Sequence, residues 1–180
     1  MNPFSTENPF AFLLDILTHL LVLVFMLRLL LQWVRADIGN PISQVILKIS
    51  NPVLLPMRRF IPPIGRMDTA SLIAMFLIQL IGLALLAMLN GYTPSPAPLI
   101  VITLVTLARA VLQLYFITLL AQALLSWLNP NPYNPATGIL HSLNAPLLNP
   151  VRRILPPMGG IDFSAMVVMI GILFLMRVIG

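Results

Sequence analysis

Four long apolar stretches restrict how this chain can fold more than any other feature. They cover about residues 10–34, 70–89, 99–128 and 163–179. A helix needs roughly 20 apolar residues to cross a bilayer, so the first three are long enough and the fourth is short but adequate. The first and third exceed the minimum, so we expect them to tilt or to emerge from the bilayer.

The composition indicates the same class of protein. Hydrophobic residues make up 59% of the chain and charged residues only 8%, whereas a soluble domain carries roughly 25% charged residues. The first stretch lacks a preceding positive region and is too long for the core of a signal peptide, so we interpret it as a retained membrane helix. We therefore predict an all-α membrane protein with four transmembrane helices.

Basic residues predict the orientation of these helices. They concentrate in the two connectors that follow the first and third spans, at Arg35, Lys48, Arg58, Arg59, Arg66, Arg152 and Arg153. Segment 90–98 carries no charge. By the positive-inside rule both connectors are cytoplasmic and both termini face the other side, with Arg177 as a weak opposing signal. Trp33 and Trp127 then stand as interface anchors at the cytoplasmic ends of spans one and three.

The second half of the chain also resembles the first half when the two are aligned at an offset of 94 residues. Between Leu30 and Asp68, 14 of 39 positions match the residue 94 places later, including Trp, Pro, Arg, Gly and Asp. We therefore predict two repeats, 1–90 and 91–180, each with the plan helix, connector, helix. Both repeats enter the membrane in the same direction, so a pseudo-two-fold axis along the membrane normal should relate them. Such hairpins would also allow a homo-oligomer.

Each connector should begin with a short helix. Asn40 and Asn134 are good N-cap residues, and the proline that follows each one suits the first helical position. Apolar residues then recur with helical spacing at Ile42, Val45, Ile46 and Ile49. A helix of about ten residues is too short to span the bilayer, so we expect an amphipathic helix that is either interfacial or re-entrant.

A proline-rich elbow should follow each short helix. We expect the first two prolines to restrict the backbone before the arginines, the Pro-Pro pair to stop any helix, the glycine to allow a sharp turn and the aspartate to cap the next span. The elbow residues are Pro52, Pro56, Pro62, Pro63, Gly65 and Asp68 in the first half and Pro146, Pro150, Pro156, Pro157, Gly159 and Asp162 in the second.

The paired arginines of the elbows, Arg58-Arg59 and Arg152-Arg153, have three compatible interpretations. They bind lipid phosphate and fix topology, they pair with the aspartates across the elbow, or they form a docking surface for a cytoplasmic partner or an anionic ligand. We expect lipid or partner binding at all four side chains. The net charge of +5 does not indicate nucleic-acid binding, because no Lys-rich run is present; phospholipid headgroups are the expected anions.

Polar and ionisable residues inside the spans are candidates for function. They are Asp15, His19 and Arg28 in the first span and Arg109 and Gln113 in the third. At the shift of 94, Asp15 aligns with Arg109 and His19 with Gln113. Residues four apart share a helix face, so each span carries a two-residue polar patch. We predict that the patches face each other with Asp15 and Arg109 paired, as a structural pair or as part of a proton or ion pathway. Alternatively, both patches lie near the outer interface and Arg109 snorkels.

The sequence shows no set of residues suited to catalysis. The absence of cysteine excludes disulfides, thiol catalysis, zinc–thiolate sites and iron–sulfur clusters. The two histidines, His19 and His141, fall on opposite sides of the membrane in this topology and cannot share a metal within one subunit. Either could serve as an axial haem ligand, although a lone histidine is more often structural. We find no phosphate-binding loop, carboxylate pair or nucleophile–His–Asp set, so we expect no enzyme, no cofactor and no metal.

The phrases "NPVLLPMRRFIPPIG" and "APLLNPVRRILPPMGGID", with "GNPIS" and "YNPAT" upstream, resemble the YggT family, also called YlmG-like. The resemblance implies an integral protein of the bacterial inner membrane, with chloroplast relatives. It associates the chain with osmotic-stress tolerance and potassium uptake, with envelope and division-site organisation, and with haem attachment during cytochrome assembly.

From this resemblance we expect a non-enzymatic scaffold or assembly factor with a membrane-protein partner. A small channel or accessory subunit supporting potassium flux is the first alternative, with Asp15, His19 and Arg109 lining or gating the path. A haem or cytochrome assembly factor is the second.

Overall fold

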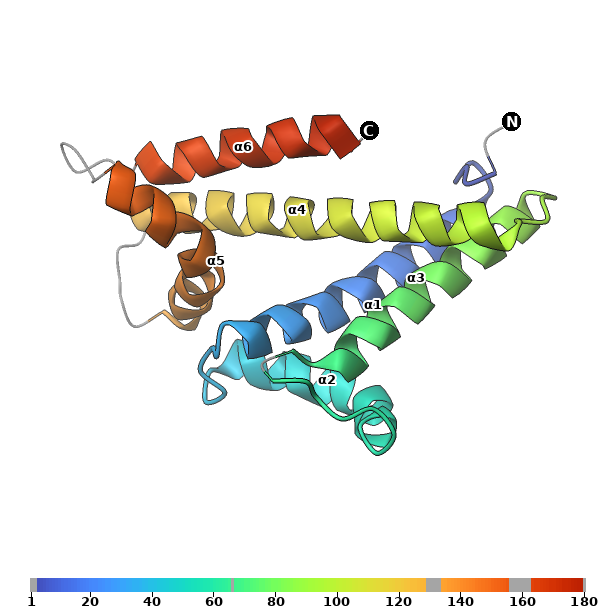
Figure 1. The fold of residues 1–180 in the computed structure, drawn as a ribbon, viewed down its shortest axis with the longest axis horizontal. Helices are drawn as coiled ribbons and strands as arrows, with labels where there is room; N and C mark the ends of the chain where they lie inside the picture. Colours follow the sequence, from blue (N-terminus) through green and yellow to red (C-terminus); the bar gives the residue numbers. More distant parts are fainter. Residues whose placement is uncertain (1–2, 66, 129–133, 156–162, 180) are drawn as a thin grey trace. The chain divides into compact units, whose positions relative to one another are not determined.

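The structure, a computed structural model, describes residues 3–65, 67–128, 134–155 and 163–179. Every regular element in these ranges is an α-helix (Figure 1). The helices are α1 (Pro9–Trp33), α2 (Pro41–Met57), α3 (Thr69–Leu89), α4 (Pro96–Leu128), α5 (Pro135–Ile154) and α6 (Phe163–Ile179). The prediction of an all-α chain is therefore confirmed for the described residues.

Three of these helices are long and apolar enough to cross a membrane. They are α1, α3 and residues 96–126 of α4. Helix α6 has the bounds predicted for the fourth span, but at 17 residues it is shorter than the other three. The helices thus agree with a membrane protein, and their ends lie within a few residues of the predicted spans.

Two compact units make up the chain, and each is described by itself. The first contains residues 1–29 and 46–108, and the second contains residues 30–45 and 109–180. The predicted halves are defined by their sequence similarity, whereas these units are defined by which residues pack together. The boundary near residue 90 therefore stays a prediction.

Helices α1 and α3 form an antiparallel hairpin in the first unit (Figure 1). Small residues on α3 allow the two backbones to approach closely, as is common between membrane helices. A Cβ atom added to Gly82 would lie only 2.4 Å from Cγ2 of Thr18 on α1. At the open end of the hairpin, the side-chain amide of Asn90 donates to the carbonyl oxygens of Pro3 and Ser5 at 3.1 and 3.0 Å.

Helices α4, α5 and α6 pack together in the second unit. Leu119, Leu148 and Ile172, one from each helix, form its buried apolar cluster. The hydroxyl of Ser164 at the start of α6 donates to the carbonyl of Leu155 at the end of α5, at 3.1 Å. This contact joins the connector helix directly to the helix that follows it.

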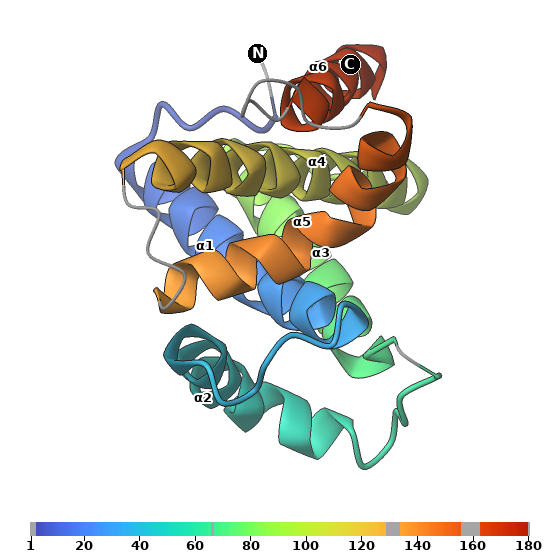
Figure 2. The same ribbon diagram turned by 90° about the vertical axis from the view of Figure 1, so that its left-hand side faces the viewer.

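The connector helices begin where the sequence predicts but continue further. Asn40 Oδ1 accepts from the Ile42 amide at 2.9 Å, and Asn134 Oδ1 accepts from the Ala136 amide at 3.0 Å, which confirms both N-caps. The expected length of about ten residues is wrong, since α2 has 17 residues and α5 has 20. Both helices are bent in Figure 2.

The extra length shows that the first two elbow prolines of each half do not end the helix. Pro52 and Pro56 lie inside α2, and Pro146 and Pro150 lie inside α5. A proline removes one amide donor from the helix ladder and costs about 3 kcal/mol in an isolated helix. All four prolines lie on exposed positions. Leu54 and Leu148, which are almost fully buried, anchor the other face, and we attribute the continuation of the helices to this packing.

Candidate functional site: a buried ion-pair cluster beside the first connector

Arg28 is the most buried cation among the described residues of the first unit, with 5% of its side chain exposed. It lies near the end of α1, where the chain is about to enter the connector. Its guanidinium donates to Ser50 Oγ and to Asn51 Oδ1 of α2, both at 2.8 Å. These two hydrogen bonds fasten the middle of α2 to the end of the first span.

Asp68 is the anion of the cluster and is fully buried. Its Oδ2 atom accepts from Arg58 Nη2 at 2.5 Å and from the Ser71 hydroxyl at 2.6 Å. The Nε atom of Arg28 lies 3.7 Å from the same oxygen. One carboxylate therefore joins the end of α1, the segment after α2 and the first turn of α3.

This geometry corrects the predicted role of Asp68 as a side-chain cap. Asp68 does occupy the N-cap position of α3, and its carbonyl accepts from the Leu72 amide at 3.1 Å. Its side chain, however, makes no capping hydrogen bond to a backbone amide. The carboxylate instead accepts a charge-assisted hydrogen bond from Arg58, which is roughly twice as strong as a neutral one, while Arg28 at 3.7 Å adds attraction between opposite charges.

The electrostatic balance of the cluster holds Asp68 in its charged form. Burial alone raises the pKa of a carboxyl group, but the hydrogen bonds from Arg58 and Ser71 outweigh it, so the pKa of Asp68 lies below its ordinary value. Two guanidinium groups share one carboxylate here. Removal of one partner from a buried ion pair is strongly destabilising, because a charge is then left buried without compensation.

The segment after the cluster forms the predicted turn. Ile64 and Met67 exchange backbone hydrogen bonds at 3.0 and 3.2 Å, and Gly65 between them has a φ of +60°. Residues with a side chain rarely adopt this conformation, which explains the glycine. The hydroxyl of Thr69 donates to the carbonyl of Pro62 at 2.6 Å and draws the elbow against the start of α3.

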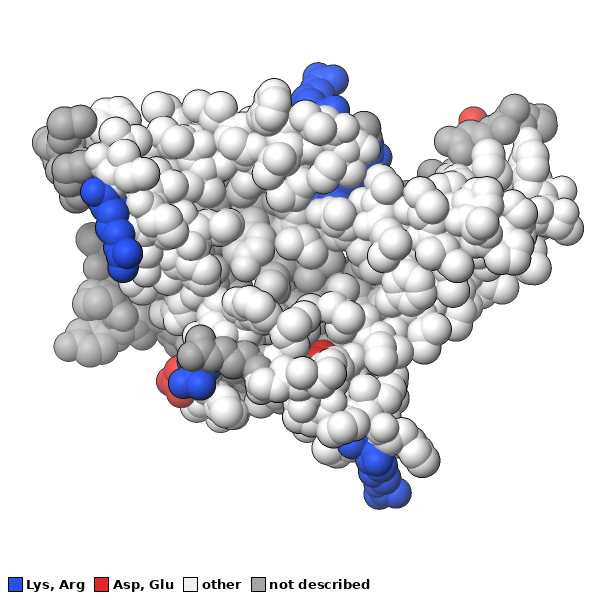
Figure 3. All heavy atoms as spheres, in the orientation of Figure 1, with Lys and Arg blue, Asp and Glu red and all other residues white. Residues whose placement is uncertain are grey.

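The second arginine of each pair is exposed. Arg59 and Arg153 both lie at the surface, whereas Arg58 is tied to Asp68 and Arg152 is only partly exposed. Basic side chains stand at a few separate places on the face shown in Figure 3, over a surface that is mostly neither acidic nor basic. Each pair thus divides into one more sheltered and one more exposed arginine.

Among its described residues, the second unit carries a neutral network at the positions equivalent to Arg28 and Ser50. Thr118 Oγ1 of α4 donates to Asn144 Oδ1 of α5 at 2.8 Å, and Asn144 Nδ2 donates to Gln122 Oε1 at 2.7 Å. Gln122 and Asn144 stand 94 residues after Arg28 and Ser50. The same pair of positions therefore joins a span to its connector helix in both units, once with a charge and once without.

The intramembrane polar residues lie at exposed or partly exposed positions. Asp15 Oδ1 and His19 Nδ1 approach to 3.3 Å within α1. Arg109 and Gln113 are exposed on α4. Asp15 and Arg109 belong to different units, so their pairing stays a prediction. Each precedes its tryptophan by 18 residues, which is about 27 Å along a helix. Snorkelling of Arg109 at the outer interface likewise stays a prediction.

Comparison with known proteins identifies the family of the chain. The family model described as CCB3/YggT matches residues 8–89 and 101–180. The chain belongs to the CCB3/YggT family. The resemblance carried by the doubled Pro-Arg phrase is therefore confirmed over nearly the whole chain.

Individual relatives in the CCB3/YggT family agree with this assignment. The chain is 36% identical to the Escherichia coli K12 protein YggT over 163 residues, which is 91% of this chain and 85% of YggT. It is also 36% identical over 169 residues to a Vibrio alginolyticus protein described as lying in the proC 3′ region, covering 93% and 91% of the two chains. No solved structure matches the chain.

Several residues singled out by the basic-residue pattern and the internal repeat lie outside the described part of the chain. They are Arg66, Pro156, Pro157, Gly159 and Asp162. Trp33 ends α1 with 47% of its surface exposed, and its role as an interface anchor stays a prediction. The side chain of Trp127 is not among those described. Among the described residues, no group of three metal-binding side chains is present.

Sequence reasoning missed the partners that complete the cluster. The predicted pairing of the connector arginines with the elbow aspartate is confirmed for Arg58, but Arg28, Ser50 and Asn51 were not expected beside Asp68. The repeat held a usable signal, because both Arg28 and its equivalent, Gln122, are polar residues in an apolar span. A polar residue in a span usually finds a partner.

Proposed function

We propose that the chain is an integral membrane scaffold made of two parallel helix–connector–helix repeats. Helices α2 and α5 begin 94 residues apart, and so do α3 and α6. The family matches separately to residues 8–89 and 101–180. In this architecture α6 is the fourth span; its 17 residues extend about 25 Å, and a small local thinning of the bilayer accommodates the difference.

The connectors in this proposal lie at the cytoplasmic face of a bacterial inner membrane, with both termini on the other side. Their basic residues support this orientation through the positive-inside rule. The apolar residues of α2 support an interfacial position: Ile42, Val45 and Ile49 are exposed, while Ile46 on the neighbouring face is buried in the protein. A helix with an exposed apolar face at this point is suited to contact with acyl chains.

The cluster around Asp68 carries the functional proposal. The contacts of Asp68 with Arg58 and Arg28 fix the shape of the first connector, and Arg59 takes no part in them. Arg59 is then held at the surface, where it can bind a lipid phosphate or the acidic group of a partner protein. Each basic residue near an anionic membrane surface contributes about 1 kcal/mol to binding. The protein would thereby organise anionic lipids and other membrane proteins around rigid connectors.

Lipid retention tests this function. We expect the protein purified from native membranes to retain anionic phospholipids in preference to zwitterionic ones in native mass spectrometry. The double substitution Arg59→Ala and Arg153→Ala should reduce that preference several-fold. Arg177→Ala is the matched control, since it removes an exposed arginine from the opposite end of a span.

Two results would argue against the scaffold. Equal loss of lipid in the control would show that any exposed arginine has the same effect. Robust, salt-dependent potassium flux through the purified protein in liposomes would instead support a channel.

A further inference from the structure

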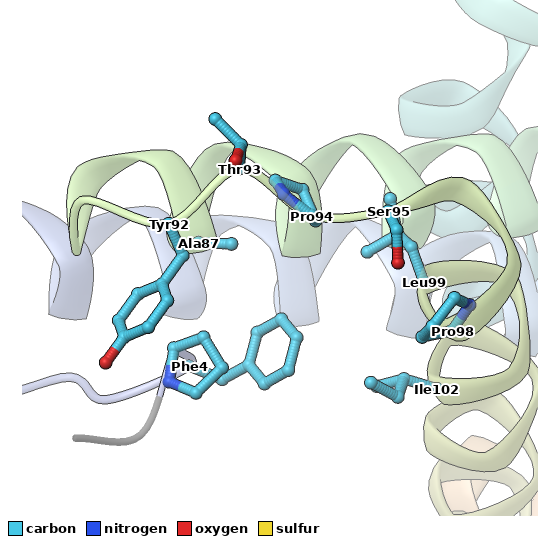
Figure 4. Close-up of a pocket in the computed structure, with 10 residues that line it drawn as sticks. Phe4, Ala87, Tyr92, Thr93, Pro94, Ser95, Pro98, Leu99 and Ile102 are labelled. Carbon is cyan, nitrogen blue, oxygen red and sulfur yellow. The ribbon is translucent and has the colours of Figure 1, made fainter.

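An apolar cavity lies in the first unit at the end of α3 that is remote from the Asp68 cluster. It has a volume of about 220 Å³ and lies between the last turn of α3, the loop to α4 and the first turns of α4. The segment before α1 forms one wall, with Phe4 beside Tyr92 (Figure 4). Nothing in the proposed scaffold function uses this cavity.

The wall formed by the N-terminal segment is held in place by specific hydrogen bonds. Asn90, just after α3, donates to the carbonyls of Pro3 and Ser5. The Ser5 hydroxyl approaches Asn90 Oδ1 at 3.4 Å. Residues 3–5 are therefore fastened across the end of the hairpin, and the hollow is a built feature of the first unit.

The lining is mostly apolar, which suits an alkyl chain. Ala87, Pro98, Leu99 and Ile102 present hydrocarbon to the cavity, and Tyr92, Thr93 and Ser95 add hydroxyl groups to its lining (Figure 4). The present volume is below the roughly 300 Å³ at which drug-sized ligand pockets begin. It therefore suits a stretch of one chain better than a bulky ligand.

The position of the cavity between α3 and α4 would bring it close to the acyl chains of a bilayer. Ala87 lies 18 residues beyond Thr69 at the start of α3, which is about 27 Å along the helix and close to the thickness of the hydrocarbon layer. Large apolar side chains on both neighbouring helices face outward, with Met88 59% and Val101 60% exposed. The cavity is thus continuous with surface that acyl chains cover.

We infer that this cavity binds one acyl chain of a phospholipid in the leaflet remote from the connectors. The chain would fill a void that otherwise leaves its lining without dispersion contacts. The headgroup would then lie near Ser95, whose hydroxyl can hydrogen-bond to phosphate or ester oxygens. The inference depends on membrane insertion and not on lipid binding by the connector arginines.

Photo-crosslinking in nanodiscs tests the inference. The probe is a phospholipid with a diazirine on one acyl chain, and adducts are mapped by peptide mass spectrometry. We expect adducts on the segment from Tyr92 to Ile102. Ile102→Phe, which fills the cavity, should reduce them at least several-fold. Ile100→Phe is the matched control, because it makes the same change two residues away at an exposed position that does not line the cavity.

Hydroxyl-radical footprinting gives an independent readout on the unmodified protein. A chain in the cavity should protect Phe4 and Tyr92 from oxidation in nanodiscs. Strong oxidation of both rings would show a water-filled cavity and overturn the inference. Equal adduct loss in the two phenylalanine variants, or no loss in either, would also overturn it, because the labelling would then report only general contact with lipid.

Discussion

Arg28 and Asp68, 40 residues apart in the sequence, approach to 3.7 Å at the end of the first hairpin where the connector lies. Arg28 is 5% exposed and Asp68 is fully buried. Together with Arg58 they join both helices of the hairpin to the connector. The stability of the connector should therefore depend on a carboxylate that is fully buried.

Asp68→Asn should be the most damaging substitution in the first connector. It leaves Arg28 buried without a counter-ion, which costs about 3–5 kcal/mol in comparable buried pairs. Unfolding in detergent by a chemical denaturant measures the change. Asp37→Asn, at an exposed carboxylate, is the control and should cost little. A loss below about 1 kcal/mol at Asp68 would contradict the importance of the cluster.

Arg28→Gln should be tolerated better than Asp68→Asn. Glutamine occupies the equivalent position 122, where it hydrogen-bonds to Asn144 at 2.7 Å. At position 28 it can still donate to Ser50 or Asn51, and Arg58 remains as the counter-ion of Asp68. We expect a loss on the order of 1–2 kcal/mol in the same unfolding assay. If Arg28→Gln and Asp68→Asn lowered the free energy of unfolding equally, a neutral glutamine network could not replace the charged one at position 28.

Stability should fall in acid because of Asp68. Its pKa is lowered in the folded state, so the carboxylate stabilises the fold above the unfolded-state pKa of about 3.9. That contribution is lost as the pH falls from there through the folded-state pKa. The difference in unfolding free energy between the native chain and Asp68→Asn should therefore be constant near neutral pH and narrow below about pH 4. A difference that widens in acid would contradict the sign of the shift.

Gly82→Ala should disrupt the contact between α1 and α3. The added Cβ atom would lie 2.4 Å from Cγ2 of Thr18, and overpacking of this kind costs about 1–3 kcal/mol. Thr18→Ala in the same chain removes that methyl group and should restore part of the loss. Gly171→Ala is the control, since a Cβ atom added there would meet no atom within 4 Å. Similar effects at both glycines would indicate a helix-propensity effect instead.

Local signals explain what could be predicted from the sequence. The Asn-Pro pairs at residues 40 and 134 mark the starts of α2 and α5, because the asparagine caps and the proline fits the first turn. Apolar runs likewise place α1, α3, α4 and α6 to within a few residues. These features depend on neighbouring residues alone, so a single sequence contains them.

Tertiary contacts explain what could not be predicted. Pro52 and Pro56 carry the local signal of a helix end, but the burial of Leu54 on the other face holds the helix together. Asp68 carries the local signal of a cap, but its side chain pairs with Arg58 and Arg28 instead of capping the amides. In both cases the decisive partner is distant in the sequence or depends on packing that no local pattern specifies.

The central claim, that the basic connectors lie at the cytoplasmic face of the membrane, is tested most directly by cysteine labelling. The chain has no cysteine, so each single substitution reports one position. Phe60 and Ile154, 86% and 79% exposed, are suitable sites in the two connector regions, and Thr6 is an exposed site near the N-terminus. In intact spheroplasts a membrane-impermeant maleimide should label Thr6→Cys. It should label Phe60→Cys and Ile154→Cys only after the membrane is permeabilised. Labelling of both connector sites in intact spheroplasts would contradict the account.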